Sequence, residues 1–99
     1  MLSLDGRIGL IFGVANQRSI AWAAARLTTE YGASVAVTYQ GDRLARTVET
    51  LVTESNLPLA LACDVTRDDD IERVFDAVRT RFGRLDFVVH SVAFAPRDA

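Results

Sequence analysis

Apolar residues occur in four short runs along the chain, and amphipathic stretches separate these runs. The runs show little alternation between apolar and polar positions, which is typical of strands buried on both faces of a parallel sheet. The three stretches between them repeat their apolar residues every three or four positions, as amphipathic helices do. The sequence therefore predicts strands over 7–12, 35–39, 57–62 and 85–89.

Polar residues and glycines mark where the three helices should begin and end. Short polar side chains suit the N-terminus of a helix, and glycine suits the position after its last turn. A threonine followed three residues later by an acidic residue resembles a capping box. The predicted boundary residues are Ser19 and Gly32 for the first helix, Asp42 for the start of the second, and Thr66, Asp69 and Gly83 for the third.

Strands that alternate with helices predict an α/β fold built from parallel β-α-β units with right-handed crossovers. This connectivity gives the strand order 3-2-1-4, with the first two helices on one face of the sheet and the third on the other. The spacing is regular and no linker interrupts it. We therefore expect residues 1–99 to belong to one domain.

Composition narrows the classes of function. The chain has 99 residues, 49% of them hydrophobic, which is enough for one modest core. A net charge of -2 argues against binding to nucleic acid or to an anionic membrane. The N-terminus lacks the features of a signal peptide, and no apolar run has membrane-spanning length. A single cysteine fits the reducing cytoplasm. With only one cysteine and one histidine in the chain, a metal site of ordinary ligand spacing is not expected.

The clearest candidate for chemistry is the turn between the first strand and the first helix. The strand ends at Gly13 and the helix begins at Ser19. The first N–H groups of a helix have no partners within it, so a pyrophosphate can accept hydrogen bonds there. Of the glycines in the common dinucleotide fingerprint only Gly13 is present, and an ordinary strand-to-helix loop is the alternative interpretation.

Ligands of open α/β sheets bind beyond the carboxyl ends of the strands. Gln40 follows the second strand there and could hydrogen-bond a ribose, or could be a polar loop residue. Asp64 follows the third and could accept a hydrogen bond from an adenine amino group, or could be a carboxylate of a turn or helix start. We expect Cys63 to be a small buried hydrophobe and His90 to be a packed, hydrogen-bonded histidine rather than a catalyst.

Four segments, in this order and spacing, resemble one known family. They are the Gly13-x5-Ser19-x-Ala21 turn, Thr38-Tyr39-Gln40, Cys63-Asp64-Val65, and the stretch from His90 to Pro96. Over its whole length the chain resembles the N-terminal portion of bacterial enoyl-acyl-carrier-protein reductases of the short-chain dehydrogenase superfamily. Ordinary members of that superfamily tend to have an Asn-Ala-Gly type of sequence in place of the last segment.

The resemblance implies a Rossmann-type doubly wound parallel sheet, a homotetramer, and reduction of the trans-2 double bond of an enoyl-acyl carrier protein by NADH. Carried over by position, the implied contacts are Gly13, Ser19 and Ile20 to pyrophosphate and nearby ribose, Gln40 to the adenosine ribose, Asp64 and Val65 to adenine, Val92 toward nicotinamide, and Ala95 to substrate. Since no basic residue lies beside Gln40, and Arg43 is the nearest, we expect NADH to be preferred over NADPH.

The family's catalytic tyrosine and lysine have no counterparts in this chain. It has no lysine, and its tyrosines, Tyr31 and Tyr39, lie at a predicted helix end and strand end. We therefore expect a fragment of a larger enzyme, with four strands and three helices of its domain and no catalytic residue. An ordinary alcohol or ketone dehydrogenase and a non-catalytic nucleotide-binding module are the alternatives.

Overall fold

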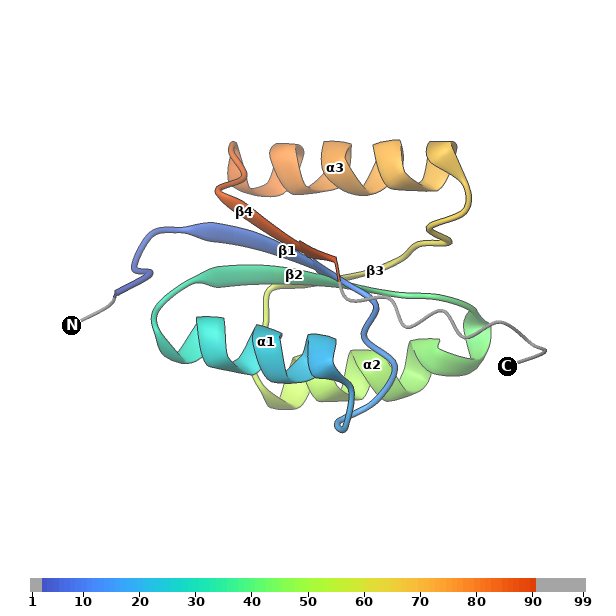
Figure 1. Cartoon of the computed structure of the whole chain (residues 1–99), viewed down its shortest axis with the longest axis horizontal. Coiled ribbons are helices and arrows are strands. Elements are labelled where there is room, and N and C mark those ends of the chain that lie inside the picture. Colours follow the sequence, from blue (N-terminus) through green and yellow to red (C-terminus); the bar gives the residue numbers. More distant parts are fainter. Residues whose placement is uncertain (1–2, 91–99) are drawn as a thin grey trace.

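Strands and helices alternate along the chain as the apolar pattern predicts. The structure is a computed structural model, and it describes residues 3–90 (Figure 1). The strands are β1 (Ile8–Phe12), β2 (Ser34–Tyr39), β3 (Leu59–Ala62) and β4 (Phe87–His90). The helices are α1 (Ile20–Glu30), α2 (Asp42–Glu54) and α3 (Asp68–Phe82).

All four strands belong to one parallel sheet in the order β3-β2-β1-β4. Helices α1 and α2 cover one face of this sheet and α3 covers the other, as Figure 1 shows. The predicted strand order and the doubly wound arrangement are therefore confirmed. In such a sheet every strand points the same way, so the turns that follow β1, β2 and β3 gather at one edge.

The two faces of the sheet have separate apolar cores. Alternate residues of β1 and β2 point to opposite faces, and both sets are buried because helices cover both faces. This double burial explains why the strand sequences are apolar without alternation. Under α1 and α2 lie Ile11, Val35 and Val37, and under α3 lie Leu10, Phe12 and Ala36. The single helix α3 leaves Val88 of β4 44% exposed.

Several predicted boundaries shift by one or two residues. Strand β3 begins at Leu59 rather than Leu57, and β4 begins at Phe87 rather than Leu85. Just before β4, the Asp86 carboxylate accepts a hydrogen bond from the backbone N–H of Ile8 at 2.7 Å. A side-chain bond thus takes the place of a strand-to-strand bond. The predicted helix ends at Gly32 and Gly83 are confirmed, since α1 and α3 end just before them.

Two predicted N-caps are wrong. The N-cap of α2 is Gly41 rather than Asp42, because the chain enters this helix at φ +89°, a conformation that glycine adopts readily. The capping box of Thr66 and Asp69 does not form, and the N-cap of α3 is Arg67, without a side-chain bond. The Thr66 hydroxyl donates instead to the carboxylate of Asp64, which follows β3.

Candidate functional site

A cavity of about 400 Å³ lies beyond the carboxyl ends of β1, β2 and β3, beside the N-terminus of α1. It lies where ligands of open α/β sheets bind. The residues that line it come from the β1–α1 turn, the end of β2, the start of α2 and the turn after β3. Among them are five of the residues that the sequence predicts, namely Gly13, Ser19, Ile20, Gln40 and Val65.

The turn after β1 is fixed to the end of β2. The backbone N–H of Gly13 donates to the hydroxyl of Thr38 at 3.3 Å, and the N–H of Val14 donates to the Thr38 carbonyl at 2.9 Å. Gly13 has φ +98°, which few side chains tolerate. The Thr38 side chain is therefore a buried support for the cavity wall, a role that sequence reasoning missed because no local pattern marks it.

Helix α1 presents unpaired backbone donors at its start. Ser19 is the N-cap, and its hydroxyl accepts from the N–H of Trp22 at 3.2 Å and donates to the carbonyl of Asn16 at 2.8 Å. Within residues 3–90, the backbone N–H groups of Ile20 and Ala21 have no hydrogen-bond partner. Together with the helix dipole, these two donors make the start of α1 suitable for an anion.

Arg18 carries the only charge among the residues that line the cavity. It directly precedes the N-cap of α1, and its backbone N–H donates to the Asn16 side chain at 2.7 Å. Arg18 is one of the five unspecified positions of the Gly13-x5-Ser19 turn, so the sequence pattern did not predict a role for it. A cation next to a helix N-terminus is the signal that could have identified it, because both features attract the same anion.

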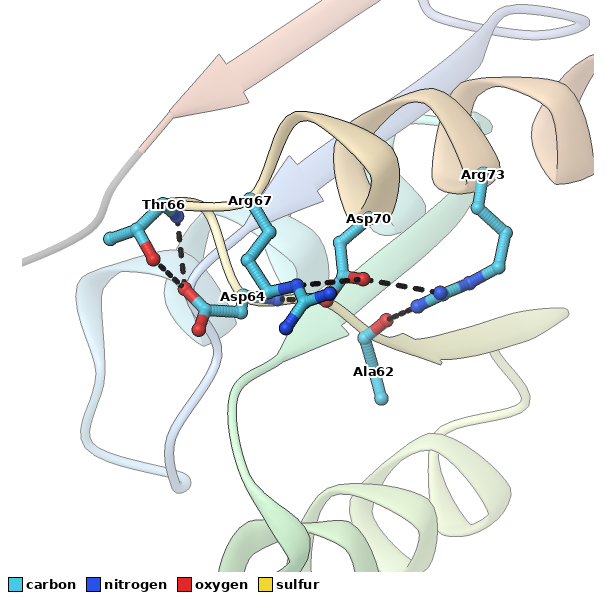
Figure 2. Close-up of polar contacts among 6 residues, drawn as sticks. All are labelled: Ala62, Asp64, Thr66, Arg67, Asp70 and Arg73. Atoms are coloured by element: carbon cyan, nitrogen blue, oxygen red, sulfur yellow. Dashed lines mark hydrogen bonds and ion pairs between the residues drawn. The ribbon is translucent and has the colours of Figure 1, made fainter.

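Asp64 does not line the cavity, although its neighbours Cys63 and Val65 do. One oxygen of its carboxylate, Oδ1, accepts from the Thr66 hydroxyl at 2.6 Å and from the Thr66 N–H at 2.9 Å (Figure 2). These hydrogen bonds from Thr66 lower the pKa of the Asp64 carboxyl. The geometry supports the interpretation of Asp64 as a turn carboxylate. Its other oxygen, Oδ2, has no partner among the described residues, so the predicted adenine contact stays a prediction.

The surroundings of Cys63 and His90 do not identify either of them as a catalytic residue. Cys63 is 3% exposed, and burial raises the pKa of its thiol, so it is a small buried hydrophobe as predicted. His90 is exposed, its ring centre lies 5.5 Å from that of Phe12, and its side chain makes no hydrogen bond within residues 3–90. The His90 ring thus lies against Phe12, and the predicted hydrogen bond of its side chain stays a prediction. Val92 and Ala95 lie outside the described residues.

Two negative findings apply to residues 3–90. They contain no group of three or more His, Cys, Asp or Glu residues that could hold a metal ion. None of their helices is long and apolar enough to cross a membrane.

A group of dinucleotide-binding enzymes is similar to this chain. The family model described as enoyl-(acyl carrier protein) reductase matches residues 13–99. The NADH enoyl-[acyl-carrier-protein] reductase 1 of Rhizobium meliloti strain 1021 is 46% identical over 95 residues, which cover 96% of this chain and 35% of that protein. The chain thus spans about a third of the length of this curated relative.

Solved structures agree with the sequence match. The reductase of Anaplasma phagocytophilum in complex with NAD is 36% identical with a TM-score of 0.88, and the match covers 96% of this chain and 36% of that one. The Bacillus cereus reductase with NADP+ and indole naphthyridinone is 41% identical with a TM-score of 0.90, covering 99% of this chain and 39% of that one. The similarity therefore extends over the whole described fold.

Proposed function

The chain belongs to the enoyl-(acyl carrier protein) reductase family, and on that basis we propose that it is the N-terminal, dinucleotide-binding part of an NADH-dependent enoyl-acyl-carrier-protein reductase. By the full-length enzyme we mean the polypeptide of which this chain is the N-terminal part. Bound NADH supplies hydride for reduction of the trans-2 double bond of the acyl chain. We further propose that the full-length enzyme is a cytoplasmic homotetramer.

One observation carries the proposal. Gly13, Ser19, Ile20, Gln40 and Val65 come from three separate segments of the chain, yet they line one cavity at the ligand-binding edge of the sheet. The strand-end pattern predicts ligand contacts at Gly13, Ser19 and Gln40, and the family resemblance implies them at all five residues, so their convergence on one cavity supports a dinucleotide as its ligand.

We propose that different parts of the cofactor bind to different residues at this edge of the sheet. The pyrophosphate belongs at the start of α1, where the Ile20 and Ala21 N–H groups lack partners and Arg18 supplies a positive charge. The adenosine ribose belongs beside Gln40, and adenine beside Asp64 and Val65. From the family resemblance we propose that Val92 acts near the nicotinamide and that Ala95 contacts the substrate; both lie outside the described residues.

Catalysis itself is assigned to residues beyond this chain. Proton donation or stabilisation of the developing negative charge at the thioester carbonyl requires a positioned donor. Neither tyrosine qualifies by position, since Tyr31 is the C-cap of α1 and Tyr39 ends β2. We propose that this segment binds and orients the cofactor, and that the remainder of the enzyme supplies the proton donor and the substrate pocket.

Steady-state kinetics of the full-length enzyme tests the function. We expect NADH oxidation that requires a trans-2-enoyl thioester and none with simple alcohols or ketones. Oxidation driven by a ketone would indicate an ordinary short-chain dehydrogenase, and NADH binding without turnover would indicate a binding module. The 99-residue chain alone should not oxidise NADH under the same conditions. Light scattering on the purified enzyme tests the proposed tetramer.

A further inference from the structure

Asp70, in the first turn of α3, connects that helix to the segment that follows β3. Its Oδ2 accepts a hydrogen bond from the backbone N–H of Asp64 at 2.9 Å, and its Oδ1 accepts one from Arg73 at 3.2 Å (Figure 2). Arg73 also donates to the carbonyl of Ala62, the last residue of β3, at 3.1 Å. One carboxylate and one guanidinium thus hold both sides of Cys63.

The segment so held forms one part of the cavity wall. The backbone N–H of Cys63 donates to the Tyr39 carbonyl at 2.8 Å. Hydrogen bonds therefore fix three consecutive residues at the end of β3, namely Ala62, Cys63 and Asp64. Cys63 and Val65 line the cavity on either side of Asp64. Figure 2 shows the Asp64 carboxylate pointing away from Asp70, on the side where it meets Thr66.

The other acidic residues of the same turn do not share this role. Asp68 and Asp69 also begin α3, where all three carboxylates favour the positive end of the helix dipole. Of these three carboxylates, only that of Asp70 accepts a hydrogen bond from a residue outside α3 within the described part of the chain. Its side chain is 19% exposed, and Arg73 lies against it. A role in helix stability alone would not require the bond to Asp64.

We propose that Asp70, held by Arg73, is a positioning residue for adenine recognition. It fixes the Asp64 peptide so that the second carboxylate oxygen of Asp64 can accept from the adenine amino group while Val65 contacts the ring. The inference rests on the proposed function, because it assumes that adenine binds at this end of the cavity.

Equilibrium binding to the full-length enzyme tests the inference without reference to turnover. Fluorescence titration gives the Kd for NADH and for reduced nicotinamide hypoxanthine dinucleotide, which lacks the adenine amino group. A hydrogen bond from that group to a carboxylate predicts a Kd ratio of about tenfold or more in favour of NADH. Asp70→Ala should bring this ratio close to one, while Tm shows that the variant is folded.

Three further variants make the test specific. Asp76→Ala removes another α3 carboxylate and should leave the ratio unchanged. Asp76 does not line the cavity, and its carboxylate pairs with the Arg79 guanidinium at 3.4 Å. Asp70→Asn should retain most of the ratio, because its amide oxygen can still accept from the Asp64 N–H. Arg73→Met removes the bonds to Asp70 and Ala62 and should lower the ratio, which keeps the test available if Asp70→Ala does not fold.

The outcomes separate the two proposals. If Asp64→Ala abolishes the ratio but Asp70→Ala and Arg73→Met preserve it, the positioning role is overturned and the placement of adenine stands. If Asp64→Ala preserves the ratio, both the adenine contact and the inference are overturned. Loss of the ratio in Asp70→Asn as well as in Asp70→Ala would assign the effect to charge rather than to the hydrogen bond, and would overturn the inference as stated.

Discussion

Replacing Gly13 by valine tests whether the β1–α1 turn is where the cofactor binds. Gly13 has φ +98°, and a β-branched residue is strained in that region of backbone space. Such strain costs about 1–3 kcal/mol. For an enzyme about three times as long as this chain, an unfolding entropy of about 2.1 cal/mol/K per residue makes this a fall in Tm of roughly 2–5 °C. We therefore expect the full-length variant to fold, with measurably lower stability.

We expect Gly13→Val to weaken NADH binding more than it lowers stability. Gly13 lines the cavity beside the start of α1, so an isopropyl group there occupies space that the pyrophosphate needs. Each hydrogen bond from the α1 N–H groups to a phosphate contributes about 1.5–3 kcal/mol. Losing one such bond raises the Kd for NADH by a factor of roughly 10–100.

Gly13→Ala is the matched control, because alanine shares most of the backbone strain but adds only one methyl group. The two variants should therefore have similar Tm values, with a clearly weaker affinity for NADH in Gly13→Val. Calorimetric titration with NADH and thermal unfolding provide both measurements. An unchanged NADH affinity in a folded Gly13→Val variant would refute the placement of the pyrophosphate at this turn.

Three further predictions follow from other parts of the structure. NADPH should bind roughly one to two decades more weakly than NADH, since Gln40 offers no charge to a 2′-phosphate and Arg43 does not line the cavity; equal kcat/KM for the two cofactors would contradict this, and would implicate Arg43. Gly9→Ala should lower the free energy of unfolding by about 1–3 kcal/mol, because a Cβ there would lie 2.9 Å from Cε1 of the Phe87 ring and closer to two other ring atoms; chemical denaturation should show recovery in Gly9→Ala/Phe87→Leu, and additive losses would exclude the clash. The hydrogen bond from the Ile8 N–H, followed by the interactions with Arg84, lowers the pKa of Asp86 below its ordinary value of 3.8. Its contribution to stability should therefore be complete above that value and disappear as the pH falls through the lowered pKa; Asp86→Asn should flatten this part of the stability–pH curve, and an unchanged curve would exclude the contribution.

The sequence was sufficient for the fold because local and global signals agree. Apolar runs, helical periodicity and terminal glycines each predict the same alternation, and right-handed crossovers leave one strand order. Helix starts were less predictable. Asp42 and Thr66 are both suitable cap residues, but Gly41 takes the first cap through its backbone conformation, and the Thr66 hydroxyl is bound by Asp64.

Some residues of the candidate site could be predicted from the sequence and others could not. Residues that follow a strand directly, such as Gly13, Gln40 and Val65, could be placed from the sequence because a parallel sheet brings its carboxyl ends together. Residues that support the cavity from another element could not. Thr38 contacts a turn 25 positions earlier, and Asp70 bonds back to Asp64 across the start of a helix. Neither contact follows from a spacing rule.

Asp64 shows why a strand-end carboxylate is ambiguous without its surroundings. A carboxylate can accept several hydrogen bonds, so the turn and the adenine contact compete only for particular oxygens. Oδ1 is satisfied by Thr66, while the backbone of the same residue is held by Asp70 on the opposite side. The turn therefore does not exclude ligand recognition by Oδ2. The turn fixes the Asp64 side chain before the ligand binds. It therefore reduces the loss of side-chain entropy that adenine binding would otherwise require.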